Sequence, residues 1–174
     1  MIKFHYEGLY KVISGAQTGA DQAGLYVARD FGLETGGHIA RTFRTSLGPM
    51  PYLAEFGIIE HSSFDYPPRT KQNALHGDMT VRLATNFNSA GEKLTLKYIH
   101  LLKKPYFDVL LDGKDYDDKA EQLALMMVEK GCTVLNVAGN ADRDTQFGYH
   151  FHEASKVLTK AFQYLDAEGL LKKS

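Results

Sequence analysis

The sequence has one cysteine, Cys132, and no tryptophan. A single thiol cannot form an internal disulfide, and no set of cysteines and histidines has the spacing of a zinc site. We therefore expect no metal centre and a reducing, cytoplasmic environment. The longest run without a charged residue, residues 131–141, falls short of the roughly 18 residues that span a bilayer. No apolar segment follows Lys3, so we expect neither a signal peptide nor a membrane partner.

Excess positive charge is also absent, because 20 Lys and Arg residues face 21 Asp and Glu residues, for a net charge of -1. A protein that neutralises several duplex phosphates needs a basic surplus, so we expect no nucleic-acid partner. The chain has no G-x-x-x-x-G-K-[ST] loop, and no tyrosine is followed by a lysine four residues later. These absences argue against a kinase, an NTPase and a short-chain dehydrogenase.

Ordinary globular composition remains, with 44% hydrophobic and 24% charged residues in a chain of 174 residues. This length predicts one domain, residues 1–174. Apolar runs alternate with helical periodicity: residues 9–14 resemble a strand, and residues 20–31 carry small and apolar side chains at helical spacing. The alternation predicts an α/β fold, a single Rossmann-like domain with a mostly parallel sheet and helices on both faces.

The same pattern continues along the chain. We expect further strands at residues 56–60, 79–84, 105–111 and 132–138, and further helices around residues 94–102, 120–128 and 154–165. The strand at 105–111 should be buried on both faces at residues 109–111. The segment of residues 32–54 shows no clear hydrophobic periodicity and is too long for a simple connection between two elements. We therefore expect a functional loop with a short strand there.

Polar and small residues follow the first strand in Ser14-Gly-Ala-Gln-Thr-Gly-Ala-Asp21. Parallel sheets bind ligands at the carboxyl ends of their strands, and free N–H groups at a helix start favour an anion. We expect a phosphate there, with Thr18 adding a hydroxyl and Asp21 capping the helix or fixing the loop. A methyl group on Gly19 should then block the anion site and leave the core nearly untouched, with a strain of ~1 kcal/mol or more if Gly19 has a positive φ. The alternative is a tight turn that binds nothing.

A second cluster contains Arg69, Thr70 and Asn73. Arg69 is suited to bidentate recognition of phosphate, and its neighbours could bind the ligand or hold the loop. Alternatively, Thr70 caps a short helix and Arg69 is a surface charge. Two later strand ends are also polar, around residues 85–91 and 136–140. His150 and His152 lack a third ligand, so we do not expect them to bind a metal.

Three segments resemble the family of "putative molybdenum cofactor carrier" proteins: Ser14–Asp21, Asp65–Asn73 together with Asp78-Met-Thr80, and Leu-Asn-Val-Ala-Gly at 135–139. That family is similar to a Rossmann-like group of cytokinin-activating phosphoribohydrolases, lysine decarboxylase-like proteins and nucleotide-ligand sensors. The resemblance covers residues 12–140. It implies a Rossmann-like fold and a phosphorylated ligand, such as a nucleotide or a molybdopterin-type molecule.

The chain departs from the family pattern at four places. Ala16 replaces a glycine, Asn140 replaces a proline, and residues 41–46 are basic where an acidic segment is usual. Ala-Gly-Glu-Lys-Leu-Thr at 90–95 stands in for G-G-T-x-x-T, which puts Glu92 in the turn that cradles phosphate.

The sequence thus predicts a protein, as a homo-oligomer, that carries, senses or sequesters a phosphorylated nucleotide- or pterin-like molecule at the carboxyl edge of the sheet. No catalytic residue is assigned. The expected ligand-binding residues are Ser14, Gly15, Ala16, Gln17, Thr18, Gly19, Ala20, Asp21, Arg69, Thr70, Asn73, Asn88, Ser89, Gly91, Thr95, Asn136 and Gly139.

Two alternatives remain open. One is an enzyme that hydrolyses a nucleotide N-glycosidic bond, although Thr95 stands where the related hydrolases have their glutamate and Glu92 is expected on a different face of the helix. The other is an interaction domain with a vestigial pocket.

Overall fold

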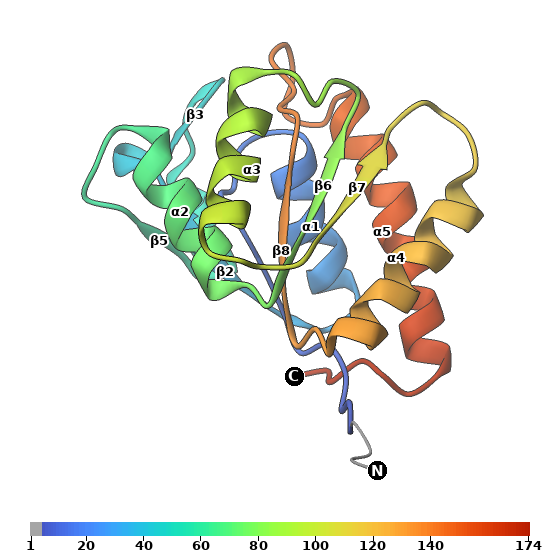
Figure 1. Cartoon of the computed structure of the whole chain (residues 1–174). Helices are drawn as coiled ribbons and strands as arrows, with labels where there is room; N and C mark the ends of the chain where they lie inside the picture. The colour runs from blue at the N-terminus through green and yellow to red at the C-terminus, as the bar shows by residue number, and fades with distance from the viewer. Residues whose placement is uncertain (1–4) are drawn as a thin grey trace.

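Six parallel strands form the central sheet of the computed structural model, which describes residues 5–174 (Figure 1). The strands are β1 (Lys11–Ser14), β2 (Glu34–Ile39), β5 (Ile58–Glu60), β6 (Met79–Ala84), β7 (Tyr106–Leu110) and β8 (Val134–Gly139). Their order is β5-β2-β1-β8-β6-β7, so the last strand in sequence lies in the middle of the sheet. A short antiparallel pair, β3 (Arg44–Thr45) and β4 (Gly48–Pro49), stands apart from it.

Helices cover both faces of the sheet, as predicted (Figure 1). Helices α1 (Ala20–Asp30), α4 (Tyr116–Lys130) and α5 (Tyr149–Ala167) pack together on one face. Helices α2 (Tyr66–His76) and α3 (Ala90–Leu101) pack together on the other. Two 3₁₀ turns, η1 (Arg41–Phe43) and η2 (Pro51–Phe56), lie near β5. The α/β Rossmann-like prediction is confirmed.

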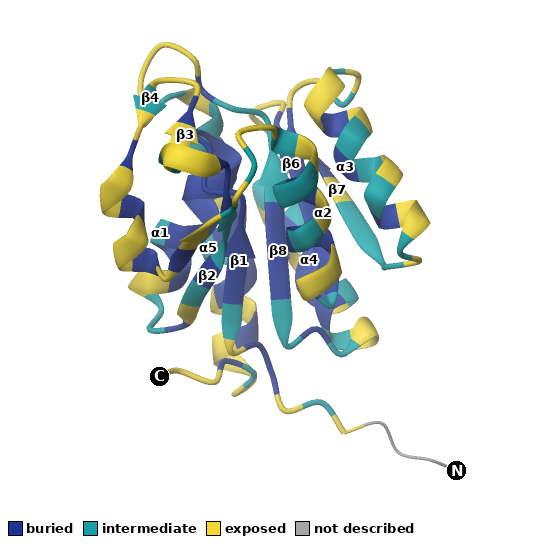
Figure 2. Cartoon of the chain, turned by 90° about the vertical axis from the view of Figure 1, so that its left-hand side faces the viewer, coloured by how far each residue is buried: buried dark blue, intermediate teal, exposed yellow. Residues whose placement is uncertain are grey.

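The main core lies between the sheet and α1, α4 and α5, and β1 and β6 are buried along most of their length (Figure 2). Helix α1 comes unusually close to β8, because a Cβ on Gly24 would lie 2.7 Å from the Cβ of Val137. Since α1 carries small residues on this side, its N-terminal end is held firmly over the end of the sheet. A smaller core, which includes Leu25 and Phe56, lies beneath η2.

The chain reverses its direction of travel across the sheet at β1, β8 and β6. The connection after β1 leads outward to β2, whereas the connection after β6 leads to β7 at the opposite edge. Ligands of open parallel sheets bind where such a reversal leaves a crevice beyond the carboxyl ends. The loops after these three strands are therefore the place to look for a site.

Two expectations about elements were wrong or incomplete. Strand β7 is not buried on both faces: it pairs only with β6 at the edge of the sheet, and Leu110 is 45% exposed. Residues 32–54 contain the expected short strand, but β2 is a full member of the sheet, paired on both sides. Helix α2 is longer than the short helix considered for Thr70, and Pro67 and Pro68 occupy its first turn, where proline is tolerated.

No helix in residues 5–174 is both long and apolar enough to cross a membrane.

Candidate functional site

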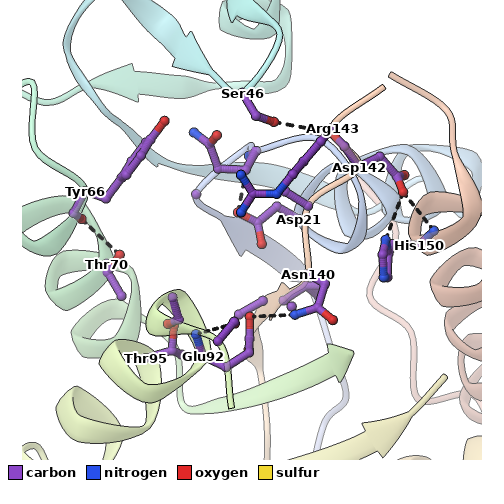
Figure 3. Close-up of a pocket in the computed structure, with 18 of the residues that line it drawn as sticks. Asp21, Ser46, Tyr66, Thr70, Glu92, Thr95, Asn140, Asp142, Arg143 and His150 are labelled. Atoms are coloured by element: carbon purple, nitrogen blue, oxygen red, sulfur yellow. Dashed lines mark hydrogen bonds and ion pairs between the residues drawn. The ribbon is translucent and has the colours of Figure 1, made fainter. Parts of the chain in front are cut away.

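A cavity of about 780 Å³ lies beyond the carboxyl ends of β1, β6 and β8 (Figure 3). Its volume falls within the range of roughly 300–1,000 Å³ typical of small-molecule sites. Its lining residues are Gly15, Gln17, Asp21, Ser46, Tyr66, Arg69, Thr70, Asn73, Thr85, Asn86, Ser89, Ala90, Gly91, Glu92, Leu94, Thr95, Asn136, Val137, Ala138, Gly139, Asn140, Ala141, Asp142, Arg143, Asp144, Thr145, Gly148, Tyr149 and His150. The structure thus brings together eleven of the seventeen residues predicted from the sequence.

Arg69 reaches from α2 to the loop after β1. A Cβ on Gly15 would lie 1.6 Å from Arg69 Nη1, so only glycine leaves room for the guanidinium at this position. The side chain of Arg69 is 13% exposed, and its Nη1 lies 3.7 Å from Asp21 Oδ2, beyond hydrogen-bond distance. Its Nε is buried without a hydrogen-bond partner among residues 5–174. Arg69 is therefore a largely buried cation with unused donors at the cavity wall.

Asp21 fixes the loop after β1, which is one of the two roles expected for it. Its Oδ2 accepts a hydrogen bond from Gln17 N at 3.2 Å. Burial raises the pKa of Asp21 to about 6, although Arg69 opposes the change. Burial also lowers the pKa of Arg69, against the attraction of Asp21. Both directions indicate that desolvation outweighs this ion pair, which favours a further partner for Arg69.

The amides of the first loop are not all free, contrary to the expected cradle. Ala16 N donates to Ser14 Oγ at 3.1 Å, and Ala20 N donates to Asn140 O at 3.1 Å. The Thr18 hydroxyl contacts Asp142 O and the Ser46 hydroxyl. These bonds join the loop to the segment after β8.

Six predicted residues consequently lie outside the cavity lining: Ser14, Ala16, Thr18, Gly19, Ala20 and Asn88. Gly19 precedes α1 with a φ of 87°, and a Cβ there would lie 2.3 Å from Asn140 O. Asn88 N donates to Asn86 Oδ1 within its own loop. The first five residues shape the cavity by holding its walls together.

Helix α2 supplies Thr70 and Asn73 along with Arg69. The Thr70 hydroxyl donates to Tyr66 O at 2.9 Å inside the helix, so Thr70 is not an N-cap. The Asn73 side-chain amide accepts a hydrogen bond from His38 N at 2.9 Å and donates one to His38 O at 3.0 Å. Asn73 thus fastens α2 to β2 and thereby positions Arg69.

Helix α3 begins at the cavity with Ser89 as its N-cap, which accepts a bond from Glu92 N at 3.4 Å. Gly91 and Thr95 also line the cavity, and the Thr95 hydroxyl donates to Gly91 O at 3.0 Å. Gly91 is exposed, and a Cβ there would meet nothing within 4 Å. Its backbone is therefore accessible to a ligand.

Glu92 lines the cavity, contrary to the expectation that it faces elsewhere (Figure 3). It is 3% exposed, its Oε2 accepts a long bond of 3.4 Å from Asn140 Nδ2, and its Oε1 has no partner among the described residues. Burial raises its pKa to about 7, Asp21 adds to the effect, and Arg82 opposes it. The site therefore holds a buried carboxyl that is readily ionised near neutral pH.

Arg82 fixes the start of α3 from beneath. This buried side chain of β6 donates to both carboxylate oxygens of Asp108, at 2.8 and 2.6 Å, and to Glu92 O at 3.0 Å. Its charge is paired with Asp108, and its contact with Glu92 is to the backbone.

The end of β8 forms the floor. Asn136 Nδ2 donates to Thr80 Oγ1 at 3.1 Å, and Asn136 Oδ1 is buried without a partner among residues 5–174. Asn140 Oδ1 accepts from Thr85 N and Asn86 N at 2.9 and 3.1 Å. Asn140, which replaces the usual proline, thus locks the loop after β6. Gly139 must be glycine, because a Cβ there would lie 1.9 Å from Leu83 O.

Sequence reasoning expected the polar strand end at residues 136–140 but missed the wall contributed by residues 141–150. Asp142 accepts from the backbone N–H groups of Gly148, His150 and Phe151 at 3.0–3.1 Å, so it caps α5. The His150 ring bonds Asp142 Oδ1 at 2.9 Å through Nδ1 (Figure 3). Its Nε2 bonds the Thr85 hydroxyl at 3.0 Å. Asp142 lies six residues before Gly148, the N-cap position of α5, which is too far for the local N-cap pattern, so the sequence carried no signal for it.

Ser46, Tyr66 and Arg143 are further additions to the predicted site. Arg143 extends over the cavity toward Asp21 (Figure 3). The Tyr66 ring lies against Arg69, with the guanidinium carbon 5.0 Å from the ring centroid. Among residues 5–174, no three His, Cys, Asp or Glu side chains are grouped to hold a metal ion.

Comparisons with known proteins agree with this architecture. The model of the circularly permutated YpsA SLOG family matches residues 12–162. The chain is also similar to the crystal structure of a "Putative molybdenum carrier protein" from Syntrophus aciditrophicus SB, with a TM-score of 0.81, 27% sequence identity, and coverage of 90% of this chain and 97% of that one. A search of curated proteins found no significant match. The resemblance to molybdenum cofactor carriers is confirmed, and the chain belongs to the circularly permutated YpsA SLOG family.

Proposed function

We propose that this protein binds a phosphorylated nucleotide- or pterin-like small molecule in the cavity at the carboxyl edge of the sheet, as a carrier, sensor or sequestering protein. Arg69 is the observation that carries the proposal. A guanidinium that is buried beside a glycine, with an unpartnered Nε, is costly unless an anion completes its hydrogen bonds. Phosphate fits the fork of donors that arginine presents.

Other features of the cavity support a ligand of this size and polarity. Arg143 supplies a second cation at the cavity. Asn136 Oδ1 and Glu92 Oε1 are buried acceptors without partners among the described residues, and they suit the N–H groups of a heterocycle. The similar protein from Syntrophus aciditrophicus is named a molybdenum carrier, which agrees with a binding role for this cavity.

The test is calorimetric titration with GMP, AMP and a phosphorylated pterin. Arg69→Ala should weaken binding by about 1.5–3 kcal/mol, the range for hydrogen bonds to charged groups. Arg69→Lys should restore only part of the loss, because the fork is missing. Arg29→Ala, an exposed change in the last turn of α1, is the control and should bind as the parent does. Equal affinity in all four proteins would remove Arg69 from the site.

Native mass spectrometry of the protein purified from cells adds an independent result. A nucleotide-sized adduct supports the binding role. A bare chain, together with no binding in the titrations, would instead support an interaction domain with a vestigial pocket.

One observation favours a second function, hydrolysis of a nucleotide N-glycosidic bond. A general acid works best when its pKa lies near the operating pH, and Glu92 lines the cavity with a pKa of about 7. Incubation with nucleoside monophosphates, NAD and ADP-ribose distinguishes the two. Release of free base that Glu92→Gln abolishes would establish the enzyme, whereas binding without release would support the carrier or sensor.

A further inference from the structure

The carboxylate of Glu92 is buried, but it makes too few hydrogen bonds within the protein to compensate for its burial. Ser89, Ala90, Gly91 and Glu92 form the S-x-x-E pattern in which the glutamate normally bonds back to the N–H of the capping serine. Here Ser89 accepts from Glu92 N, but the carboxylate does not return the bond: Oε2 accepts from Asn140 and Oε1 has no partner among the described residues. The carboxylate can therefore accept hydrogen bonds from a ligand in the cavity.

We infer that Glu92 recognises two adjacent N–H donors of the ligand, and that the ligand therefore carries a 2-amino-4-oxopyrimidine edge, the edge shared by guanine and pterins. This inference rests on the proposed function, which supplies the cavity and the phosphorylated ligand. It adds which heterocycle is selected, and by which side chain.

Charge supports a donor rather than a phosphate beside Glu92. The guanidinium of Arg82 bonds both oxygens of Asp108 and reaches only the backbone carbonyl of Glu92. Asp21 and Asp142 are further buried carboxyls of the cavity, and the charge of Asp21 raises the pKa of Glu92, which disfavours another anion beside it. A phosphate beside Glu92 would add to this repulsion, whereas N–H groups would relieve it. The phosphate is accordingly assigned to Arg69 and the heterocycle to Glu92.

The position of the carboxylate is also fixed well enough for specificity. Asn140 is bonded to Thr85 and Asn86 while it donates to Glu92 Oε2. Arg82 holds the first turn of α3 through Glu92 O. A side chain supported in this way can discriminate edges, because an ill-matched ligand leaves a buried oxygen unpaired.

The chemistry of the bases then ranks the ligands. Guanine offers its ring N–H and its 2-amino group side by side, so both can donate to one carboxylate. Hypoxanthine keeps the ring N–H but lacks the amino group. Xanthine carries an oxygen in place of the amino group, and adenine presents a lone pair in place of the ring N–H, so each would meet the carboxylate with a repulsive contact.

The experiment measures Kd by calorimetry for GMP, IMP, XMP, AMP and 6-hydroxymethylpterin phosphate. For the parent protein, the affinity for GMP should exceed that for IMP by roughly 10–100-fold, the range of one hydrogen bond to a charged group, with XMP and AMP weaker still. Glu92→Gln replaces one acceptor with an amide donor. This change should weaken the binding of GMP by a similar factor and strengthen the binding of XMP, because the oxygen of xanthine now meets an N–H group.

Glu121→Gln makes the same chemical change on the exposed side of α4, outside the cavity, and should leave every Kd unchanged. Melting temperatures of all three proteins check that each is folded. A reversal of the GMP and XMP preferences cannot arise from a merely structural effect of Glu92, since loss of structure would weaken all ligands together.

The outcomes separate the possible sources and errors. Tight binding of the pterin phosphate without GMP identifies a pterin as the ligand, and the opposite result identifies guanine; both support the inference. Binding of AMP as tight as GMP, or an unchanged order of ligands in Glu92→Gln, would overturn it while leaving the proposed function intact. Binding of none of the five compounds would overturn the proposed function and the inference together.

Discussion

Replacing Gly19 with alanine tests how the cavity is built. Gly19 precedes α1 with φ 87° and ψ −132°, a conformation that residues with a side chain rarely adopt. A Cβ at this position would lie 2.3 Å from Asn140 O and 2.9 Å from both Ala141 Cα and Asp142 N. All three atoms belong to the backbone, so none can move aside by a change of rotamer.

The expected cost has two parts. The unfavourable backbone conformation costs on the order of 1–3 kcal/mol. Insertion of a methyl group against fixed backbone costs about 1–3 kcal/mol more. The free energy of unfolding should therefore fall by about 2–6 kcal/mol. The sequence alone suggested a smaller effect, because it did not show that the first loop packs against the segment after β8.

Urea unfolding followed by circular dichroism measures the change, with Gly91→Ala as the control. Gly91 lies in the first turn of α3 with open space around its Cβ position, so alanine there should be neutral or stabilise by up to about 1 kcal/mol. Ordinary surface substitutions change the free energy of unfolding by about 0.5 kcal/mol or less. If the free energy of unfolding of Gly19→Ala lies within that range of the parent value, the argument from backbone contact is refuted.

Two further predictions concern the charged groups of the cavity. Gly15→Ala should weaken ligand binding and cost less stability than Gly19→Ala, because its Cβ would displace the flexible end of Arg69 rather than backbone; titration and urea unfolding of the same sample check this. Because the pKa of Glu92 is raised in the folded state from 4.5 to about 7, its contribution to stability is full below pH 4.5 and is lost as the pH rises through 7, a decrease on the order of 3 kcal/mol. Unfolding free energies of the unliganded protein at pH 5–8 should show this decrease. Glu92→Gln should reduce it to the smaller decrease that the pKa of Asp21, raised to about 6, still causes. An equal decrease in both proteins would contradict the argument.

Local patterns predicted the elements with strong periodicity. The small and apolar residues of α1 recur every three or four positions, and Gly131 ends α4 with a φ of 62°, as a C-terminal glycine should. Strand β2 was harder because its Gly36-Gly37 pair gives no alternation. Gly37 is nevertheless required, since a Cβ there would lie 2.1 Å from Ser14 O of the neighbouring strand. Such a requirement arises from packing between distant segments and leaves no periodic signal.

The site was predictable where one segment alone determines it and unpredictable where two segments meet. The loop after β1 was located correctly, but its Ala20 N–H and Thr18 hydroxyl donate to Asn140 O and Asp142 O, which adjoin the loop only because β8 lies next to β1. The wall formed by residues 141–150 was missed for the same reason.

Glu92 shows this limit most clearly. It is the third residue of α3, and side chains in the first turn of a helix point back toward its N-terminus, here toward the loops after β6 and β8. Local geometry therefore permits two positions for the carboxylate, bonded to the capping serine or turned toward those loops. Asn140 selects the second, because its amide is held by Thr85 and Asn86 and donates to Oε2. The same asparagine replaces the proline of the family pattern, and proline has no side-chain amide to donate. The two departures at positions 92 and 140 thus form one contact, which the family pattern with threonine and proline could not make.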